Sequence, residues 1–533
     1  MSFFCSVNSD SEDNFSDTES LPSTDFEPFL DTAPSFQSVS VENINQDFSD
    51  LDVTFGHPNQ HNILEELRKD NKNVYNRLRS IEVDADFVDN VAEIFPKLPL
   101  IANERCGTWY VRPKKLFYQT VYFKSTDGHT GKWNLNLRRL NLHLLDIIEQ
   151  HHGCILVDST RRGKRVPDSL SKTVPIWCCA INNAIYQWRQ QQIINGTLTK
   201  EELPQNWDLE FHSLPSVISA SEHSQISDRM ADFVQKLSSS GINLSKLSSL
   251  LQKPLRPLWY TPQSQLSATT NICYEDEPFY PVLCLSASRQ IKSAMEPQPG
   301  YMYIQGSADD HECWAMGLTP SLFWENHESI LAADAATCER RVREIVAKAK
   351  KSQSSEHYGE QWLDKSGKPI QRPFDFIEGT TIAIGSRTSG RPPQCWNTFD
   401  CIINCCELEY NDNLDETHKS EYLHLNIPEG KKGQSTLLEL IPKALEFAKE
   451  KLTENRTILV HCAQGKDRSV GIALAIMIHY YNEAGDIVPE GVAKSQVTKD
   501  LILRKLLQIT ESHPSASPSR ATLKKINLFF MGY

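Results

Sequence analysis

The chain has 533 residues, of which 39% are hydrophobic and 23% are charged. This length is too great for one hydrophobic core, and the composition excludes a chain that is disordered throughout, so we expect two folded domains and a tail. No run of about eighteen apolar residues occurs, and the start lacks the basic flank of a secretory signal. We therefore expect a cytoplasmic protein with no membrane partner, and no protein partner is evident.

The net charge of −13 is unevenly distributed. Residues 1–56 contain twelve Asp or Glu and no Lys or Arg, a net of −12, which leaves the remainder near −1. Residues 105–172 contain thirteen Lys or Arg against five Asp or Glu, a net of +8. Such a stretch suits a phosphate backbone, although a solvated basic face is the alternative. Fourteen cysteines without Cys-x-x-Cys spacing favour neither a zinc site nor a disulfide framework.

The predicted elements begin after an acidic tail, residues 1–60, whose charge bias makes it a poor core former and predicts disorder. Apolar periodicity predicts the following elements in chain order: a helix from about 63 to 81, short strands between 109 and 122, a helix over 135–148, a strand over 154–157, a helix around 230–237, a strand over 280–285 and a charged helix over 336–351. This mixture predicts an α/β domain over residues 61–355. The polar stretch 352–367 is the expected linker to a second domain, residues 356–533.

The second domain contains a loop suited to phosphate. A short apolar strand is predicted at 458–460, and it leads through His461-Cys-Ala-Gln-Gly-Lys-Asp-Arg468 into an apolar helix over 470–480. Backbone N–H groups and the helix N-terminus of such a turn converge on one point, which favours an anion. Arg468 can contact two phosphate oxygens, and the same field lowers the pKa of Cys462, with Ser469 in reach of its sulfur.

This loop resembles that of the protein tyrosine and dual-specificity phosphatases, and residues 381–386 and 399–404 resemble the first and the following strand of the latter. We therefore expect a cysteine-phosphatase-like α/β domain. The candidate catalytic residues are Cys462, Lys466, Asp467 and Arg468, and the candidate phosphate ligands are His461, Gln464, Gly465 and Ser469. Two departures stand out. The upstream segment 425–432 offers Glu429 in place of the usual Asp acid, and Lys466 inside the loop suits a more highly charged ligand than a phosphotyrosine.

The first domain has polar loops after apolar strands. Strand 154–157 leads into Asp158-Ser-Thr-Arg-Arg-Gly-Lys-Arg165, where the acid can contact a sugar hydroxyl or magnesium, although an Arg-rich turn is most often only surface. The candidate phosphate ligands here are Ser159, Thr160, Arg161 and Lys164. The candidate RNA contacts are Arg105, Lys124, Arg138, Arg162, Arg165 and Lys172. Asp309, Asp310 and Glu312 are candidate metal ligands, with a polar turn before Trp314 as the alternative.

Several blocks in the same order resemble the fungal and plant initiator-tRNA 2′-O-ribosylphosphate transferases. The blocks are residues 98–107, 122–131, 157–165, 171–177, 309–312 and 461–469. The resemblance implies transfer of 5-phosphoribosyl from phosphoribosyl pyrophosphate to the 2′-hydroxyl of adenosine 64 in the T-stem of initiator methionine tRNA. It implies these two molecules as partners and exclusion of the modified tRNA from elongation. Because negative charge develops on the departing pyrophosphate, we expect Mg²⁺ as a cofactor.

Two other functions remain open from the sequence. The Cys-x5-Arg loop also fits a phosphatase that acts on RNA ends or phosphoinositides, and the basic stretch also fits an RNA-binding adaptor without catalysis. The missing Asp acid and the large first domain count against the phosphatase. The familiar phosphoribosyltransferase signature does not occur intact, and Val157-Asp158-Ser159-Thr160 is only a partial match.

Overall fold

The computed structural model describes residues 73–104, 106–117, 119–161, 163–200, 203–204, 206–265, 272–293, 295–352, 373–410 and 418–532. Backbone contacts divide the chain into Met1–Gln60 and His61–Tyr533, and every described residue belongs to the second unit. The predicted tail and nearly all of the predicted linker lie outside the described residues. The domain boundary near 355 stays a prediction.

The first domain is built on a parallel sheet with the strand order β1-β2-β4-β3. The strands are β1 (Leu100–Ala102), β2 (Cys154–Asp158), β3 (Leu255–Tyr260) and β4 (Tyr280–Ser286). β2 and β4 are buried along their whole length, as expected of apolar strands covered on both faces. Because all four strands are parallel, their carboxyl ends lie along one edge, where open α/β sheets bind ligands.

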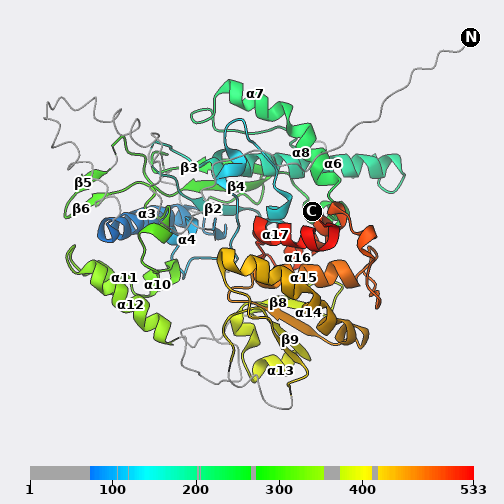
Figure 1. The fold of residues 1–533 in the computed structure, drawn as a ribbon. Coiled ribbons are helices and arrows are strands. Elements are labelled where there is room, and N and C mark those ends of the chain that lie inside the picture. The colour runs from blue at the N-terminus through cyan, green and yellow to red at the C-terminus, as the bar shows by residue number, and fades with distance from the viewer. Residues whose placement is uncertain are drawn as a thin grey trace, which may run out of the picture. The chain divides into compact units, whose positions relative to one another are not determined.

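Helices cover both faces of this sheet (Figure 1). One face packs its alternate residues, such as Leu156 and Cys284, against α5 (His143–His151), α6 (Val174–Ile194), α8 (Met230–Ser238) and α9 (Leu244–Leu250). The other face, including Val157 and Leu285, packs against α3 (Val74–Ile94), α4 (Gly107–Tyr110), α10 (Pro320–Glu325), α11 (His327–Leu331) and α12 (Cys338–Ser352). The remaining elements are α7 (Ala220–Asp228) and a hairpin of β5 (Glu296–Gln298) and β6 (Tyr301–Tyr303).

Two predicted elements of this domain differ from the structure. Residues 107–110 form the short helix α4, in which Trp109 and Tyr110 are fully buried. Of the strands predicted between 109 and 122, the described residues show only isolated bridges at Leu116 and Val121. The helix predicted over 135–148 begins only at His143. The positive φ of Asn141, 49°, interrupts the helical path before that point. The strands at 154–157 and 280–285 and the helix at 336–351 are confirmed.

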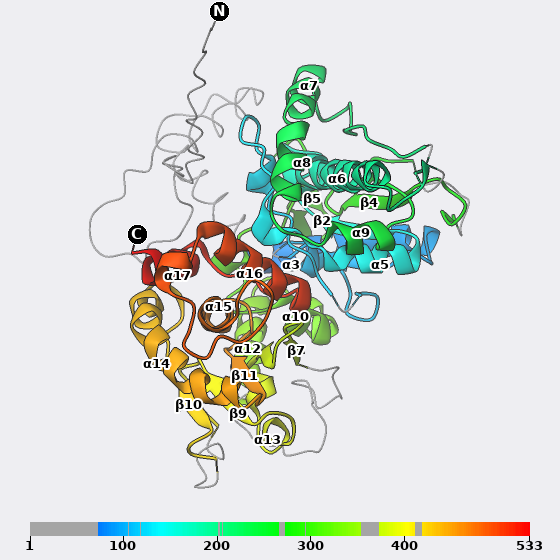
Figure 2. The ribbon, with the colours of Figure 1, turned by 90° about the vertical axis from the view of Figure 1, so that its right-hand side faces the viewer.

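The second domain has a five-stranded sheet in the order β10-β9-β11-β8-β7. The strands are β7 (Phe374–Phe376), β8 (Ile382–Gly385), β9 (Cys401–Asn404), β10 (Tyr422–His424) and β11 (Ile458–His461), and only the pair β7 and β8 is antiparallel. Helices α14 (Gly433–Thr453), α15 (Arg468–Tyr480), α16 (Lys499–Ser512) and α17 (Arg520–Met531) lie on one face, and α13 (Gln394–Thr398) lies on the other. Figure 2 shows α15 end-on among α14, α16 and α17.

The fold class is thus α/β in both domains, as the sequence predicts. The central helix α15 is apolar on all sides, since its neighbours bury it from Val470 through Ile478. Among the described residues, no helix is long and apolar enough to cross a bilayer.

Candidate active site

The phosphate loop connects β11 to α15, as predicted. Gly465 has a φ of +77°, and a Cβ there would lie 2.9 Å from the backbone carbon of Gly385 at the end of β8. The loop therefore requires glycine at this position. The His513 ring also holds it, because Nε2 lies 3.0 Å from the Gly465 carbonyl oxygen while Nδ1 lies 2.6 Å from Asp375.

The Cys462 sulfur lies in an environment that favours the thiolate. Its Sγ accepts a hydrogen bond of 3.2 Å from the Ser469 hydroxyl. Burial alone raises the pKa of Cys462. The Ser469 hydroxyl, the backbone N–H groups of Ser469 and Gln464 and the charge of Arg468 outweigh burial, so that the pKa is lowered. The lowered pKa of Cys462 is therefore the one that the loop composition predicts.

The Arg468 guanidinium is nearly buried beside this sulfur. Its Nη1 donates a hydrogen bond of 2.8 Å to the Ile427 carbonyl oxygen, and its Nη2 lies 3.9 Å from the Glu429 carboxylate. The pocket in front of the loop is lined by Ile427, Pro428, Glu429, Gly430, Gly433, Gln434, Leu437, Cys462, Gln464, Lys466, Asp467 and Arg468. The segment that carries the acid in cysteine phosphatases thus contributes only a solvent-exposed glutamate to this pocket.

Two residues predicted at this site have other tasks. His461 is 1% exposed, and its ring packs so closely on Gly390 that a Cβ there would lie 2.4 Å from Nε2. Burial lowers the pKa of His461 to about 3, and the enclosed ring does not line the pocket in front of the loop. Asp467 Oδ1 accepts hydrogen bonds from the Ser519 backbone N–H at 2.8 Å and from the Thr522 hydroxyl at 2.6 Å. This geometry gives Asp467 the task of anchoring the start of α17.

Lys466, the additional cation of the loop, contacts the first domain. Its Nζ lies 2.7 Å from Oε1 of Glu104, a residue that follows β1 almost directly. The phosphate loop and the carboxyl edge of the parallel sheet are therefore joined by an ion pair between residues 362 positions apart in the sequence.

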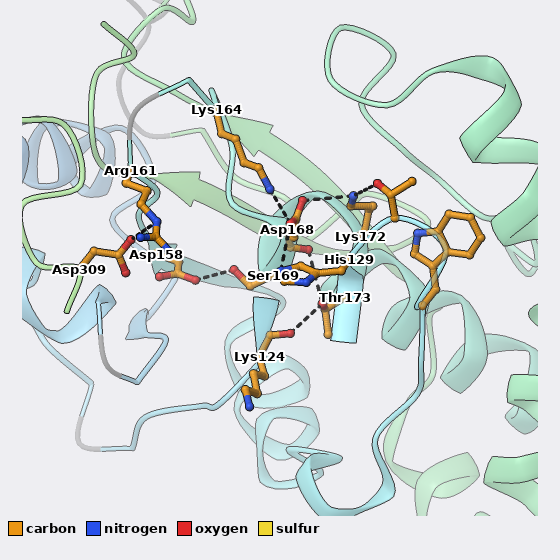
Figure 3. Close-up of polar contacts among 12 residues, drawn as sticks. Lys124, His129, Asp158, Arg161, Lys164, Asp168, Ser169, Lys172, Thr173 and Asp309 are labelled. Atoms are coloured by element: carbon orange, nitrogen blue, oxygen red, sulfur yellow. Dashed lines mark hydrogen bonds and ion pairs between the residues drawn. The ribbon is translucent and has the colours of Figure 1, made fainter. Parts of the chain in front are cut away.

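At that edge the central group is Asp158, the last residue of β2 (Figure 3). Its Oδ2 accepts hydrogen bonds of 2.8 Å from the Asn103 amide and 2.5 Å from the Ser169 hydroxyl. Burial raises the pKa of Asp158 to about 6, against the lowering effect of these donors. Three chain segments, the ends of β1 and β2 and the turn before α6, thus converge on one carboxylate.

Ser159 and Thr160, the predicted phosphate ligands next to Asp158, are 6% and 7% exposed. The Ser159 hydroxyl lies 2.6 Å from that of Ser288, which donates to Asp84 at 2.6 Å. The Ser159 hydroxyl is therefore engaged within the protein, and the low exposure of both residues means that they do not form an open phosphate site.

Arg161 is the exposed cation of this edge. Its guanidinium lies 3.5 Å from Asp309 (Figure 3). It also lies 3.6 Å from Asp310, and both acids are predicted metal ligands. In the part of the chain that the structure describes, no group of three or more His, Cys, Asp or Glu side chains is arranged to hold a metal ion. Asp309, Asp310 and Glu312 therefore do not make a complete metal site by themselves.

The prediction that Lys172 contacts RNA is wrong in this structure. Lys172 is 4% exposed, and its Nζ lies within 3.1 Å of Asp168, 3.1 Å of Glu222 and 3.2 Å of the Thr130 hydroxyl. These three partners use all three ammonium donors. The side chain is an internal counter-ion that fixes the turn before α6.

The other predicted cations have different positions. Lys164 lies 2.6 Å from Asp168 but is half exposed, and Arg165 donates to the Thr261 hydroxyl. Arg138 lines a second hollow, together with Glu104 and residues 510–511 and 514–517. The Lys124 carbonyl accepts from Thr173. Arg105 and Arg162 lie outside the described residues.

Sequence reasoning missed Asn103, Glu104 and Ser169 as site residues. The first two directly follow β1, and the end of a parallel strand beside β2 is the signal that points to them. Ser169 lies in a π-helical turn, Ser169–Thr173, which no local pattern in the sequence indicates.

The fold and these sites define a two-domain α/β protein in which a parallel-sheet domain precedes a cysteine-phosphatase-like domain. Comparison with known proteins identifies the family. Residues 67–347 match the Rit1 N-terminal domain and residues 421–530 match the Rit1 DUSP-like domain. The chain belongs to the Rit1 family.

Two relatives match over nearly their whole length. An uncharacterized protein of Schizosaccharomyces pombe is 35% identical over 85% of this chain and 93% of its own. A Saccharomyces cerevisiae protein named tRNA A64-2′-O-ribosylphosphate transferase is 32% identical over 88% of this chain and 94% of its own. Among solved structures, the Yvh1 phosphatase domain from Chaetomium thermophilum is 22% identical, with a TM-score of 0.24, over 30% of this chain and 96% of that chain.

Proposed function

We propose that this protein transfers 5-phosphoribosyl from phosphoribosyl pyrophosphate to the 2′-hydroxyl of adenosine 64 in cytoplasmic initiator methionine tRNA. The observation that carries the proposal is the similarity to the Saccharomyces cerevisiae transferase, which extends through both domains. Exclusion of the modified tRNA from elongation follows from the same proposal.

The reaction breaks the bond between the anomeric carbon and pyrophosphate and forms a bond from that carbon to the 2′-oxygen. The 2′-hydroxyl loses a proton, and pyrophosphate leaves with its electron pair. Positive charge grows on the ribose and negative charge on the leaving pyrophosphate. The site therefore needs fixed protein charges of opposite sign near each of these two groups. Asp158, which is 4% exposed, binds Asn103 and Ser169 and so orders the strand ends beside which the sugar would lie. Arg161 and Lys164 provide exposed positive charge at the same edge.

Asp309 and Asp310 are the residues that would hold a magnesium ion. Mg²⁺ takes oxygen ligands, and in phosphate sites one or two carboxylates suffice because substrate and water supply the rest. A magnesium ion held there would neutralise charge that develops on the leaving pyrophosphate. The phosphate loop, through Arg468 and its backbone amides, binds a phosphate of the donor.

The test is incorporation of labelled phosphoribosyl pyrophosphate by the full chain into purified initiator tRNA, with elongator methionine tRNA as the matched control. The proposal predicts label on the initiator alone, and loss of that label when magnesium is chelated. No label on either tRNA, with phosphate released from an RNA or lipid phosphomonoester, would replace this function with a phosphatase.

The phosphatase alternative has one favourable observation, the lowered pKa of Cys462 beside Ser469. The general-acid position counts against it, because an exposed glutamate, Glu429, stands there in place of the usual aspartate. Turnover of a generic aryl phosphate by wild type and not by Cys462→Ser would support this second function.

A further inference from the structure

Both cations of the phosphate loop face carboxylates of the protein itself. Arg468 lies 3.9 Å from Glu429, whose side chain is 70% exposed, so this pair is loose. Lys466 lies 2.7 Å from Glu104, and these side chains are only 35% and 22% exposed. The second pair is therefore the tighter and better shielded one.

Glu104 is firmly placed for this contact. Its backbone N–H donates to the Val121 carbonyl oxygen at 2.7 Å, and its Oε1 also accepts from the Thr120 hydroxyl at 3.1 Å. The preceding residue, Asn103, is bonded to Asp158 at the strand ends. The carboxylate is thus fixed by the first domain.

We propose that Glu104 competes with the anion bound in the phosphate loop, because its carboxylate pairs with the Lys466 ammonium that lines that pocket. A phosphate in the loop then competes with Glu104 for Lys466. A residue of the parallel-sheet domain thereby sets the anion affinity of the phosphatase-like domain. This inference goes beyond the proposed transfer reaction, and its failure would leave that proposal unaffected.

The experiment measures binding of inorganic phosphate to the full chain by titration calorimetry. Glu104→Gln keeps the shape of the side chain and removes its charge, so Lys466 is released to the pocket. We expect phosphate to bind about two- to five-fold tighter, the range of a partly exposed ion pair. Removal of a negative charge near the pocket also tightens binding by simple electrostatics, so a second background is needed.

Lys466→Ala provides that background. With no lysine to release, Glu104→Gln changes phosphate affinity only through the loss of its negative charge. The gain in phosphate affinity is then at least about two-fold smaller than the gain in the wild-type background. Glu429→Gln is the matched control, because it removes a carboxylate that faces Arg468, and its gain is the same with or without Lys466. Glu104→Asp, which keeps the charge but is one methylene shorter, provides a second variant if Glu104→Gln does not fold.

Three results would overturn the inference. The first is an equal gain in phosphate affinity from Glu104→Gln in the wild-type and Lys466→Ala backgrounds. The second is weaker phosphate binding in Glu104→Gln, and the third is the absence of saturable phosphate binding in every variant. Circular dichroism melts of each variant show that the compared proteins are folded.

Discussion

Ser469→Ala tests the thiolate environment of the phosphate loop most quantitatively. The Ser469 hydroxyl donates to Cys462 Sγ at 3.2 Å, and it is the largest of the influences that lower the pKa of that thiol. A hydrogen bond to a charged group contributes roughly 1.5–3 kcal/mol, and sulfur is a weak acceptor, so the low end applies. Since about 1.4 kcal/mol corresponds to one pKa unit, we expect the pKa of Cys462 to rise by about one unit.

The assay is the rate of Cys462 alkylation by iodoacetamide between pH 5 and 10, followed by mass spectrometry of the Cys462 peptide. Well below the pKa, the rate in Ser469→Ala falls by up to about ten-fold, because only the thiolate reacts. Ser420→Ala, the same substitution at an exposed serine of this domain, leaves the profile unchanged. A Cys462 pKa in Ser469→Ala equal to that of wild type would refute the reasoning.

Three further predictions concern charge and anchoring. Burial raises the pKa of Asp84 to about 7. The contribution of Asp84 to the free energy of unfolding therefore falls as the pH rises from about 4 through 7, by up to roughly 1.4 kcal/mol per pH unit. Thermal melts over this pH range show the loss in wild type and not in Asp84→Asn. Asp467→Ala lowers the free energy of unfolding, measured in urea, by about 1–3 kcal/mol, because Ser519 and Thr522 lose their acceptor. The control Asp486→Ala changes that free energy by no more than about 0.5 kcal/mol. Equal effects of the two substitutions would contradict the anchoring role of Asp467. Cys462→Ser keeps tRNA transfer while Arg468→Ala loses it at least about ten-fold, and the reverse result would assign covalent chemistry to the sulfur.

The phosphate loop could be predicted because its parts are contiguous. A strand, a glycine turn and a helix within about twenty residues place Cys462, Ser469 and Arg468 together without help from the rest of the chain. The same locality explains why β2 and β4 were predicted from short apolar runs. Local pattern was sufficient wherever the structure depends on neighbours in sequence.

The errors arose where distant residues decide. Lys172 looked like a surface cation, but Glu222, fifty positions later, buries and neutralises it. His461 looked like a ligand, but packing against Gly390 encloses its ring. The contact between Glu104 and Lys466 joins two domains, and no local pattern indicates it. Tertiary partners, which a single sequence does not specify, set the burial and charge of these side chains.

The most direct test of the central claim is transfer from labelled phosphoribosyl pyrophosphate to two initiator tRNAs that differ in one atom. One carries the natural ribose at adenosine 64, and the other carries 2′-deoxyribose at that nucleotide. The account predicts label on the ribose form and none on the deoxy form, since the 2′-oxygen is the acceptor. Equal labelling of both would contradict it.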